Sequence, residues 1–492
     1  MDDIQSLKDE IDKRVHFINT YVALGESHMV DFFVQNHWNT LVHPDAQSQL
    51  LQFDEDDLYS VKNIMQMGMF RDTSQQGPDT HTIQNLKEYF SRAKSCAIDN
   101  STFCMDTNSV ERKLKELAVD CESRNGDVSV VNQLVSANEY MCNKKSHEVE
   151  EMSHLVQKTC QKLGIKDVLD MGSGKGYLGT HLSLKYDLNV VGVDCSEANS
   201  VNASSRAGKF LKYWNAHLKN KSDKQFETRD MKYQPVTALV HADSDINFLF
   251  VNDNEENSNS ILHKQLMLTG LHICGDLSST ALRMFVSKKQ IKAACLLGCC
   301  YHHLTSKSTG KEYGFPMSKY LQKMDFSLGR NSKMLGLKAL DRMQDADIAA
   351  TEKKSTRSLF YRAVLSVILE REFQFGSGLK DLRVGKVYSK SKNFIDYVRR
   401  SLSKLSYPDE TSKILSDDAI TSYMNEMENY RKTLLAFNAL REAFSPAVEA
   451  IILLDKLLYL REHEIPHSYL VKLFDPVKSP RCYALVSIKS KD

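Results

Sequence analysis

The sequence predicts an α/β fold: a Rossmann-like sheet with an N-terminal helical region and a large helical insertion. Helix and strand patterns alternate between about residues 145 and 305, which is typical of βαβ units that form a parallel sheet. The segments on either side show apolar residues at helical spacing. With 492 residues, 42% hydrophobic and 26% charged, the chain has the length and composition of a globular protein with more than one domain.

We expect four segments along the chain. Residues 1–135 form the N-terminal helical region, and residues 136–305 form the α/β core. Residues 306–464 form the helical insertion, because SLFYRAVLSVILEREF and AVEAIILLDKLLYL have long helical patterns. Residues 465–492 read as two strands around a proline-containing turn, which would complete the sheet.

The core opens with a helix that leads into the first strand. Ser146 is the expected N-cap of this helix, and Gly164 lies just past its end. Further strands are expected over KDVLDMG, NVVGVDC, VTALVHAD, MLTGLHICGD and KAACLLGCCY. The polar run 252–260 has too little apolar content to pack, so we expect a surface loop there.

A glycine-rich loop joins the first strand to the next helix. It reads Asp170-Met-Gly172-Ser-Gly174-Lys-Gly176, and its glycines allow a ligand to approach the backbone amides at the helix start. Asp170 can accept a hydrogen bond from a cationic amino group, which predicts a cofactor that carries an amino acid. Such a loop also occurs for tight packing alone. A P-loop is excluded, because Gly176 stands where Ser or Thr would be.

Two further acidic residues are expected to bind the same cofactor. Asp194 ends the second strand about twenty residues beyond the glycines, where an acidic side chain binds ribose hydroxyls. The third strand is expected to end at Asp243, which would face the adenine ring in the usual strand order.

The candidate catalytic bases are His272, Asp276 and His302, with His303 beside them. All four lie at or just after the carboxyl ends of the fourth and fifth strands, where open α/β sheets bind ligands. Transfer of a group to a hydroxyl or amine requires that a proton be removed, which suits these residue types. Either His272 or His302, taken alone, could equally be a satisfied core residue.

The cysteines near the fifth strand are expected to pack as small apolar side chains, and no metal site is predicted. Cys299 and Cys300 are neighbours in a strand, so their side chains should point to opposite faces. No C-x-x-C pair occurs in the chain. A metal site would therefore need a bulge at this point.

Two charged segments remain open to two interpretations. Lys144, Lys145, His147 and Glu148 form either a solvated helix start or a contact to substrate or cofactor. The segment 380–404 contains eight Lys or Arg residues interleaved with aromatic ones, so it forms either a nucleic-acid contact or a solvated helix face.

With these residues in view, the chain resembles the methyltransferase-like protein 25 family, also called ribosomal RNA adenine dimethylase domain-containing, within the class I methyltransferases. The segments that carry the resemblance are MCNKKSHEV, DMGSGKGYLG, GLHICGDLS, LLGCCYHHLT, GFPMSKYL and FDPVKSPR. The resemblance implies S-adenosyl-L-methionine as cofactor, bound by the loop and Asp194. HICGD and CCYHH are also similar to segments of a tRNA 2′-O-methylating family, which implies RNA as a substrate by analogy.

Methylation of the exocyclic amine of adenine is not supported by the residues. Enzymes of that type place an Asn or Asp, two prolines and an aromatic residue after the fourth strand. Here this position reads His272-Ile-Cys274-Gly275-Asp276.

The leading hypothesis is therefore a methyltransferase that acts on RNA or, less favoured, protein. The alternatives are a non-catalytic scaffold that binds S-adenosylmethionine, an RNA- or protein-binding module, and a nicotinamide-dependent oxidoreductase. Lys and Arg (64) almost balance Asp and Glu (63), so any basic surface is local. No secretory signal or membrane span is recognisable, so we expect an intracellular protein without a membrane partner, in cytoplasm or nucleus.

Overall fold

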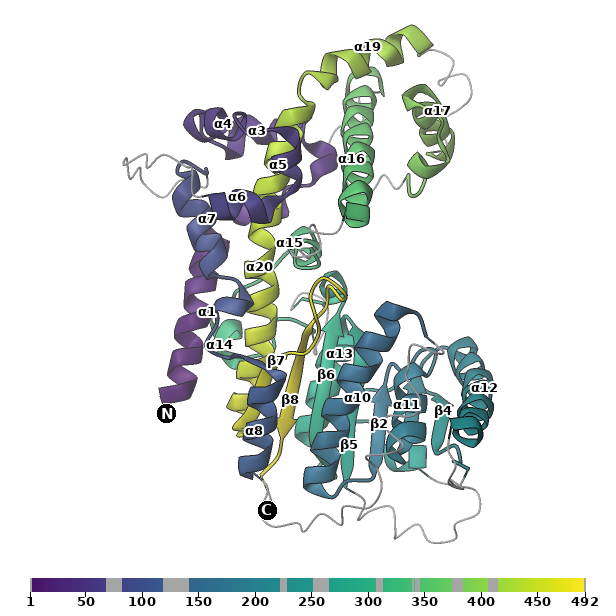
Figure 1. Cartoon of the computed structure of the whole chain (residues 1–492). Helices are drawn as coiled ribbons and strands as arrows, with labels where there is room; N and C mark the ends of the chain where they lie inside the picture. The colour runs from purple at the N-terminus through teal and green to yellow at the C-terminus, as the bar shows by residue number, and fades with distance from the viewer. Residues whose placement is uncertain are drawn as a thin grey trace. The chain divides into compact units, whose positions relative to one another are not determined.

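The alternating segments fold into one eight-stranded sheet (Figure 1). The computed structural model describes residues 2–67, 82–117, 141–221, 228–250, 265–306, 313–338, 340, 346–373, 384–405 and 415–490. The strand order across the sheet is β1 (Cys104–Asp106), β7 (His467–Lys472), β8 (Tyr483–Ile488), β6 (Ile291–Cys299), β5 (Leu266–Cys274), β2 (Asp167–Met171), β3 (Asn189–Asp194) and β4 (Tyr233–Thr237). Strand β8 is antiparallel to both of its neighbours, and all other pairs are parallel.

The strand order reverses between β2 and β5, which are hydrogen-bonded neighbours with β3 and β6 on their outer sides. In an open α/β sheet this reversal leaves a crevice at the carboxyl ends of the two strands, and ligands bind there. The sheet therefore confirms the predicted Rossmann-like fold class and places the glycine-rich loop, which follows β2, at the reversal.

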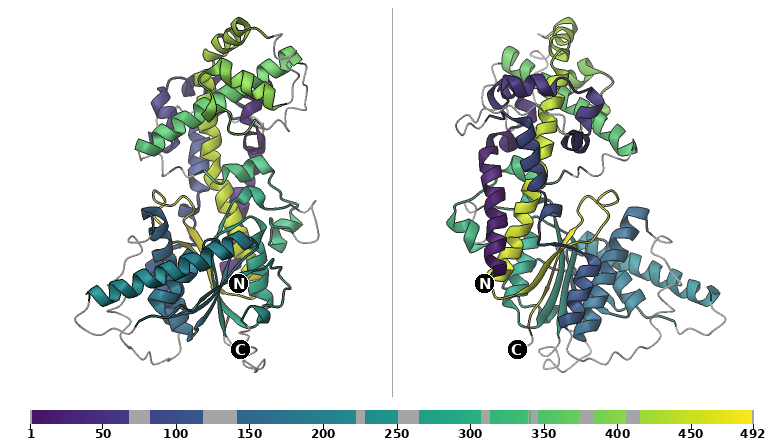
Figure 2. Two further views of the ribbon diagram at one scale, coloured as in Figure 1. Left: turned by 90° about the vertical axis from the view of Figure 1, so that its right-hand side faces the viewer. Right: turned by 60° about the vertical axis from the view of Figure 1, so that its left-hand side comes forward.

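Helices cover both faces of the sheet (Figure 2). Four helices that contact one another in series lie on one face: α8 (Thr107–Leu117), α10 (Asn143–Leu163), α11 (Tyr177–Tyr186) and α12 (Glu197–Lys221). The other face carries α13 (Asp276–Ser287), which packs on β5 and β6. Right-handed crossovers explain the division, because the chain winds outward in opposite directions from β2 and from β5.

Three local predictions differ from the structure. The third core strand ends at Thr237 and not at Asp243, because its partner β3 ends at Asp194, opposite Thr237. Helix α10 begins at Asn143 with Cys142 as N-cap, so Ser146 lies inside the helix; its predicted end at Gly164 is confirmed by a φ of 70°. The three-residue strand β1 was not predicted, because it is too short to show a pattern.

The chain divides into two compact units. Unit 1 comprises residues 1–13, 98–328 and 449–492 and contains the sheet and α14 (Lys319–Lys323); unit 2 comprises residues 14–97 and 329–448. Two of the four boundaries fall within the long helices α1 (Asp2–Thr20) and α20 (Arg431–Glu462). The four predicted domain ranges cut the chain at other residues and stay a prediction.

All regular elements that the structure describes in unit 2 are helical. They are parts of α1 and α20 together with α2 (Val22–Glu26), α3 (His37–Leu41), α4 (Pro44–Leu50), α5 (Glu55–Tyr59), α6 (Val61–Met67), α7 (Leu86–Ser95), α15 (Arg330–Leu335), α16 (Ala346–Phe373), α17 (Phe394–Lys404) and α19 (Asp417–Glu428). Aromatic rings fill its core, and Phe17 contacts both Tyr89 and Phe444. The buried Tyr89 hydroxyl donates a hydrogen bond to the Leu440 carbonyl at 2.7 Å.

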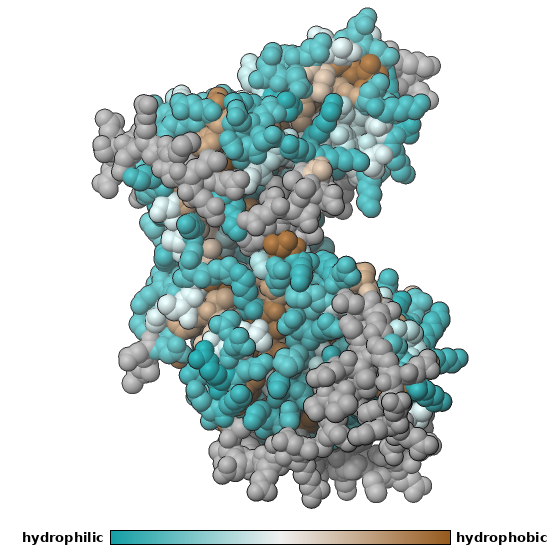
Figure 3. All heavy atoms as spheres, in the orientation of Figure 1, coloured by the Kyte–Doolittle hydropathy of each residue, from teal (hydrophilic) through white to brown (hydrophobic). Residues whose placement is uncertain are grey.

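The outer surface shows the charge balance of the sequence. Among the coloured residues in Figure 3, hydrophilic ones cover most of the visible face, and hydrophobic ones form only small patches. Within the described part of the chain, no helix is both long enough and apolar enough to span a bilayer. The predicted loop at residues 252–260 lies outside the described residues.

Candidate functional site

The glycine-rich loop bends sharply between β2 and α11. Gly172, Gly174 and Gly176 have φ angles of 65°, 54° and 70°, a conformation in which a side chain would be strained. Gly176 is the N-cap of α11, so the helix begins at the loop with free backbone N–H groups at its first turn. The structure thus gives the loop the shape that the sequence predicts, although the N–H groups of Ser173, Gly174 and Gly176 already donate hydrogen bonds within the protein.

A tyrosine that the sequence did not single out packs beneath this loop. Tyr233 is buried in β4, and a Cβ atom added to Gly176 or Gly192 would lie 2.7 or 2.6 Å from its hydroxyl oxygen. A Cβ on Gly179 would also overlap the ring. Packing on Tyr233 therefore requires all three glycines, and Gly176 is also required by its backbone conformation. Only the spatial neighbourhood of β3, β4 and α11 reveals this role.

Asp170 is a buried carboxylate that lacks a partner. Its side chain is 1% exposed, and neither oxygen has a hydrogen-bond partner among the described residues. Burial and, to a smaller extent, the nearby charge of Asp194 raise the pKa of Asp170 to about 8, against a smaller lowering contribution from the Gly179 backbone N–H. Ionisation of a buried carboxyl group without a partner is unfavourable, and a cationic group of a ligand would stabilise the ionised form.

Asp194 ties the loop to the following helix. Its Oδ2 accepts a hydrogen bond from the Gly174 N–H at 3.0 Å, and its Oδ1 accepts from the Ser196 N–H at 2.9 Å and from Asn199 Nδ2 at 3.0 Å. An ionised carboxylate has about four acceptor positions, so three bonds leave room for about one more donor. Asp194 is half-buried and lies at the carboxyl end of β3, beside the loop.

Asp243 does not join these residues. It is exposed in a turn six residues after the end of β4, and its carbonyl accepts a hydrogen bond from Lys288 Nζ at 2.9 Å. Lys288 follows the last turn of α13, whereas the first turn of α13 is the one at the carboxyl end of β5. The prediction that Asp243 ends the third strand is therefore wrong, because this strand ends at Thr237. The predicted contact of Asp243 with adenine stays a prediction.

His272 lies in a bulge at the carboxyl end of β5. The pairing register with β6 shifts between Leu271 and Ile273, and His272 has a φ of 62°, which is rare for a residue other than glycine. Its Nε2 lies 3.0 Å from Glu148 Oε1, and its side chain is 24% exposed. The bulge thus turns the imidazole toward α10 and leaves part of the ring accessible.

Glu148 is the buried centre of this arrangement. It is 0% exposed and also accepts hydrogen bonds from Lys145 Nζ at 2.7 Å and Ser479 Oγ at 2.8 Å. Burial alone would raise the pKa of Glu148, but hydrogen bonds and charges from His272 and Lys145 outweigh burial and lower it to about 2. The interpretation of this segment as a solvated helix start is therefore wrong for Glu148, which is ionised inside the protein.

The C-terminal segment 474–481 completes this side of the site. Besides Ser479, the Asp475 N–H donates to His147 Nε2 at 3.2 Å, and the buried Arg481 forms a 2.6 Å ion pair with Glu449 of α20. Glu449 also accepts a hydrogen bond from the buried Tyr301 hydroxyl at 3.0 Å. Segments more than three hundred residues apart in the sequence are therefore joined around the ends of β5 and β6.

The other two predicted bases lie close by, but one of them is already engaged. Asp276 begins α13, and its Oδ1 accepts a hydrogen bond from the Thr305 N–H at 2.8 Å. It therefore holds the turn that follows β6. His302 is in this turn, with its ring centroid 3.9 Å from that of His303. His303 in turn packs against Gly275, where an added Cβ would lie 2.6 Å from His303 Cβ.

The two halves of the predicted site meet at the strand-order reversal. A Cβ atom added to Gly172 would lie 3.0 Å from Leu277 Cδ2 and 3.5 Å from Ile273 Cγ2. The glycine-rich loop thus touches the segment that carries His272 and Asp276. Of the predicted site residues, only Asp243 is separated from this region.

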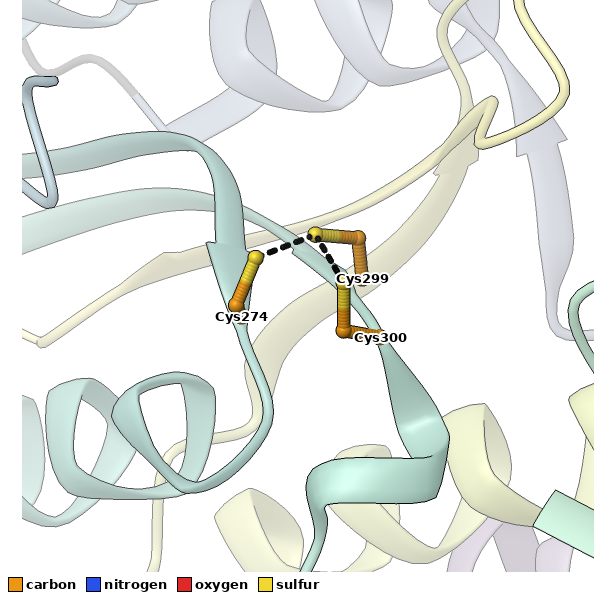
Figure 4. Close-up of side chains that lie close together, drawn as sticks. All are labelled: Cys274, Cys299 and Cys300. Atoms are coloured by element: carbon orange, nitrogen blue, oxygen red, sulfur yellow. Dashed lines mark hydrogen bonds between the residues drawn. The ribbon is translucent and has the colours of Figure 1, made fainter. Parts of the chain in front are cut away.

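Three thiols gather beside His272, contrary to the sequence argument. Cys274 Sγ lies 3.1 Å from Cys299 Sγ, which lies 3.7 Å from Cys300 Sγ (Figure 4). Cys300 has φ 53° and ψ 50°, so the chain has left the strand and adjacent side chains need not point to opposite faces. The hydrogen bond with Cys299 lowers the pKa of Cys274 to about 6 against the effect of burial, with smaller contributions from Cys300 and His272.

The basic segment 380–404 has an ordinary packing role where it is described. Residues 380–383 lie outside the described residues. Phe394 and Tyr397 are buried, and both rings contact Tyr361 of α16, so they are not free to stack on bases. Arg399 and Arg400 form ion pairs with carboxylates of the same unit. The solvated helix face is therefore the better interpretation of this segment.

Known proteins share the part of the chain that builds the site. Residues 144–307 match a family model described as a methyltransferase domain. A Mus musculus protein named probable methyltransferase-like protein 25 is 29% identical, over 99% of this chain and 98% of its own length. A Homo sapiens protein of the same name is 31% identical over the same shares of the two chains. The likeness extends over both units, and the domain model includes Glu148, Asp170, Asp194 and His272.

Proposed function

Because the chain belongs to the methyltransferase-like protein 25 family, we propose that it uses S-adenosyl-L-methionine to methylate a hydroxyl or amine group of RNA. The family and the methyltransferase domain provide the reaction class. The cofactor proposal rests on the site itself, whereas the acceptor proposal rests on sequence similarity together with the candidate base.

The unpaired carboxylate of Asp170 carries the proposal for the cofactor. A buried acidic group at the carboxyl end of β2, with both oxygens unsatisfied among the described residues, suits the α-ammonium group of an amino acid. A pyrophosphate, as in a nicotinamide cofactor, would be repelled there. This observation favours S-adenosylmethionine over a dinucleotide.

The neighbouring residues suit the rest of this cofactor. Asp194 has capacity for about one further donor, which a ribose hydroxyl would use. The amides of the glycine-rich loop and the start of α11 lie beside it. S-adenosylmethionine, when bound, supplies an electrophilic methyl group on a sulfonium, which a nucleophile attacks in line.

His272 is the proposed general base, and Glu148 is the proposed positioning residue. Because Glu148 is ionised, it accepts a hydrogen bond from His272 Nε2–H, which leaves the lone pair of the imidazole on Nδ1. Nδ1 can then take a proton from an acceptor hydroxyl or amine, while Glu148 stabilises the resulting imidazolium. Asp276 and His302 would shape the adjacent turn.

RNA is proposed as the acceptor class on the similarity of HICGD and CCYHH to a tRNA 2′-O-methylating family. A ribose hydroxyl requires a base for its proton, which the His272–Glu148 pair provides. A protein acceptor is the alternative, and a single assay distinguishes the two acceptor classes.

The test is transfer of a labelled methyl group to pools of cellular RNA and protein, followed by digestion with nuclease or protease. We expect the label to be released by nuclease. The variant His272→Asn should lower transfer about 100-fold or more, the usual size of a general-base contribution, with unchanged cofactor affinity. Asn is a suitable replacement because it tolerates the positive φ at this position.

A second histidine offers a matched control. His154 Nε2 lies 3.2 Å from Glu111 Oε1, so it forms the same type of pair on α10, at a more exposed position. His154→Asn should leave methyl transfer unchanged. Label released only by protease would contradict the RNA proposal. Cofactor binding without transfer to either pool would favour a non-catalytic scaffold.

A further inference from the structure

The sulfur atoms of Cys274, Cys299 and Cys300 lie within 4.8 Å of one another at the carboxyl ends of β5 and β6. In Figure 4 their side chains point toward a common centre, with Cys299 between the other two. None of the three is in a disulfide. Three soft donor atoms in one place are the characteristic ligands of thiophilic metal ions.

The backbone explains why these thiols converge. Cys274 and Cys299 are register partners on parallel strands, so their side chains leave the sheet on the same face. Cys300 would point to the opposite face in a continuing strand, but its left-handed conformation turns the chain and brings its sulfur back. A short helical turn, Tyr301–His303, then begins, and the Tyr301–Glu449 hydrogen bond anchors it.

The sulfur spacing suits one tetrahedral ion. Zinc–sulfur bonds of about 2.3 Å place the sulfur atoms of two ligands about 3.8 Å apart in a tetrahedral site. The Cys299–Cys300 distance of 3.7 Å meets this value, and the Cys274–Cys299 distance of 3.1 Å must lengthen by about 0.7 Å. Cys274 is exposed and can rotate outward, whereas Cys299 is buried.

The fourth coordination position is open. Within the described chain, the group contains no further His, Cys, Asp or Glu ligand atom. Three protein ligands with one open position are the arrangement of reactive zinc sites, whereas structural sites close all four. Cys274 provides the exposed side, so water or a substrate atom has access.

A buried cation lies close enough to offset the charge of such a site. Lys456 Nζ donates to Ser278 Oγ at 2.5 Å and lies 3.4 Å from the position of a Cβ on Gly298. Gly298 is next to Cys299 in β6. Three thiolates and one divalent ion carry a net charge of −1, which an ammonium group inside the protein partly balances.

We propose that Cys274, Cys299 and Cys300 bind one Zn²⁺ ion with an open fourth position, beside the proposed methyl-transfer site. The three thiols lose their protons to solvent as the ion binds, and no oxidation or reduction occurs. The bound ion faces the same strand ends as His272, and a ligand in the open position would lie at the sheet edge. This inference does not depend on methyl transfer or on cofactor binding.

The test uses the full chain, purified under reducing conditions. We expect about one equivalent of zinc by mass spectrometry of the metal, and Co²⁺ in place of Zn²⁺ should show the sulfur-to-cobalt charge-transfer absorption of a multi-thiolate site. Each of the variants Cys274→Ser, Cys299→Ser and Cys300→Ser should weaken zinc binding at least about tenfold in competition with a chromophoric chelator. Circular dichroism would verify that each variant is folded.

Cys142→Ser is the matched control, because Cys142 is an exposed thiol outside the cluster. It should leave zinc content and the cobalt spectrum unchanged. The proposal is overturned if the folded wild type binds no zinc, or if the triple serine variant binds zinc as tightly as the wild type. A Cys274–Cys299 disulfide in the reduced preparation would equally overturn it.

Discussion

Two buried carboxylates lie near the same edge of the sheet, but their surroundings shift their pKa values in opposite directions. Asp170, at the end of β2, has no hydrogen-bond partner among the described residues, and burial raises its pKa to about 8. Glu148, which contacts the end of β5, has close polar contacts with His272, Lys145 and Ser479 and a longer ion pair with Lys144, and despite burial its pKa is about 2. We infer that Asp170 needs a ligand as its partner, whereas Glu148 is already paired within the protein.

The largest expected effect is on stability, at the carboxylate with partners. Glu148→Ala removes a buried charge together with its hydrogen bonds to His272, Lys145 and Ser479, so the free energy of unfolding should fall by about 3 kcal/mol. Chemical denaturation measures it. The control Glu151→Ala removes a carboxylate that is 43% exposed on the same helix and should change stability by less than about 0.5 kcal/mol. Equal effects of the two variants would refute the role of Glu148.

The next effect is on affinity, at the carboxylate without partners. Asp170→Asn should weaken S-adenosylmethionine binding about 100-fold, because a charge-assisted contact to the ammonium group is worth roughly 2–3 kcal/mol. The same variant should not lose stability, since the Asp170 side chain has no hydrogen-bond partner among the described residues that the substitution would remove. Calorimetry and denaturation measure the two quantities. A stability loss comparable to that of Glu148→Ala would erase the contrast between the two carboxylates.

A packing change tests the scaffold beneath the loop. Gly192→Ala places a Cβ atom 2.6 Å from the Tyr233 ring and 3.0 Å from Ser173 Cβ, so the unfolding free energy should fall by about 1–3 kcal/mol. Gly208→Ala in α12 is the control, because no atom lies within 4 Å of the added Cβ. It should stabilise the protein by about 0.5–1 kcal/mol, as alanine does in a helix. Destabilisation by both would count against the role of Tyr233.

The last two predictions concern pH, and the first is a pH dependence at the unpaired carboxylate. The folded-state pKa of Asp170 is raised from 3.8 to about 8, so without ligand the unfolding free energy should fall as pH rises through this range. The ionised form binds the ammonium group, so cofactor affinity should rise between pH 6 and 7.5, at most about tenfold per pH unit. Asp170→Asn should remove this trend in calorimetric titrations.

Glu148 should behave in the opposite way. Its pKa is lowered from 4.5 to about 2, so its contribution to stability is complete above pH 4.5 and is lost as pH falls toward 2. Glu148→Gln should therefore flatten the stability profile in acid only. A change in the profile between pH 6 and 8 would show that the two carboxylates are not independent.

Features that depend on adjacent residues were predictable from the sequence. The apolar run before Asp170 and the glycines after it predict β2, the loop and the start of α11. The alternating apolar segments predict the parallel sheet, because each buried strand is a continuous hydrophobic run. Asp194 follows from its position at the end of such a run.

Features that depend on distant residues were not predictable. Glu148 is at an ordinary helical position, and its burial arises from Ser479, 331 residues away, and from the bulge at His272. Tyr233 gains its role only because three glycines of other elements approach its ring. The apolar residues beyond Thr237 suggest a continued strand, but β3 offers no partner there. The turn at Cys300 has no sequence signal, since left-handed conformations favour glycine or asparagine.

The role of Asp170 is tested most directly by calorimetric titration of the wild type and Asp170→Asn with S-adenosylmethionine and with nicotinamide dinucleotides. We expect one S-adenosylmethionine per wild-type chain, a folded Asp170→Asn variant with about 100-fold weaker binding, and no dinucleotide binding. A folded wild type that binds no S-adenosylmethionine, or a variant that binds it as tightly as the wild type, would show that the Asp170 carboxylate does not hold this cofactor.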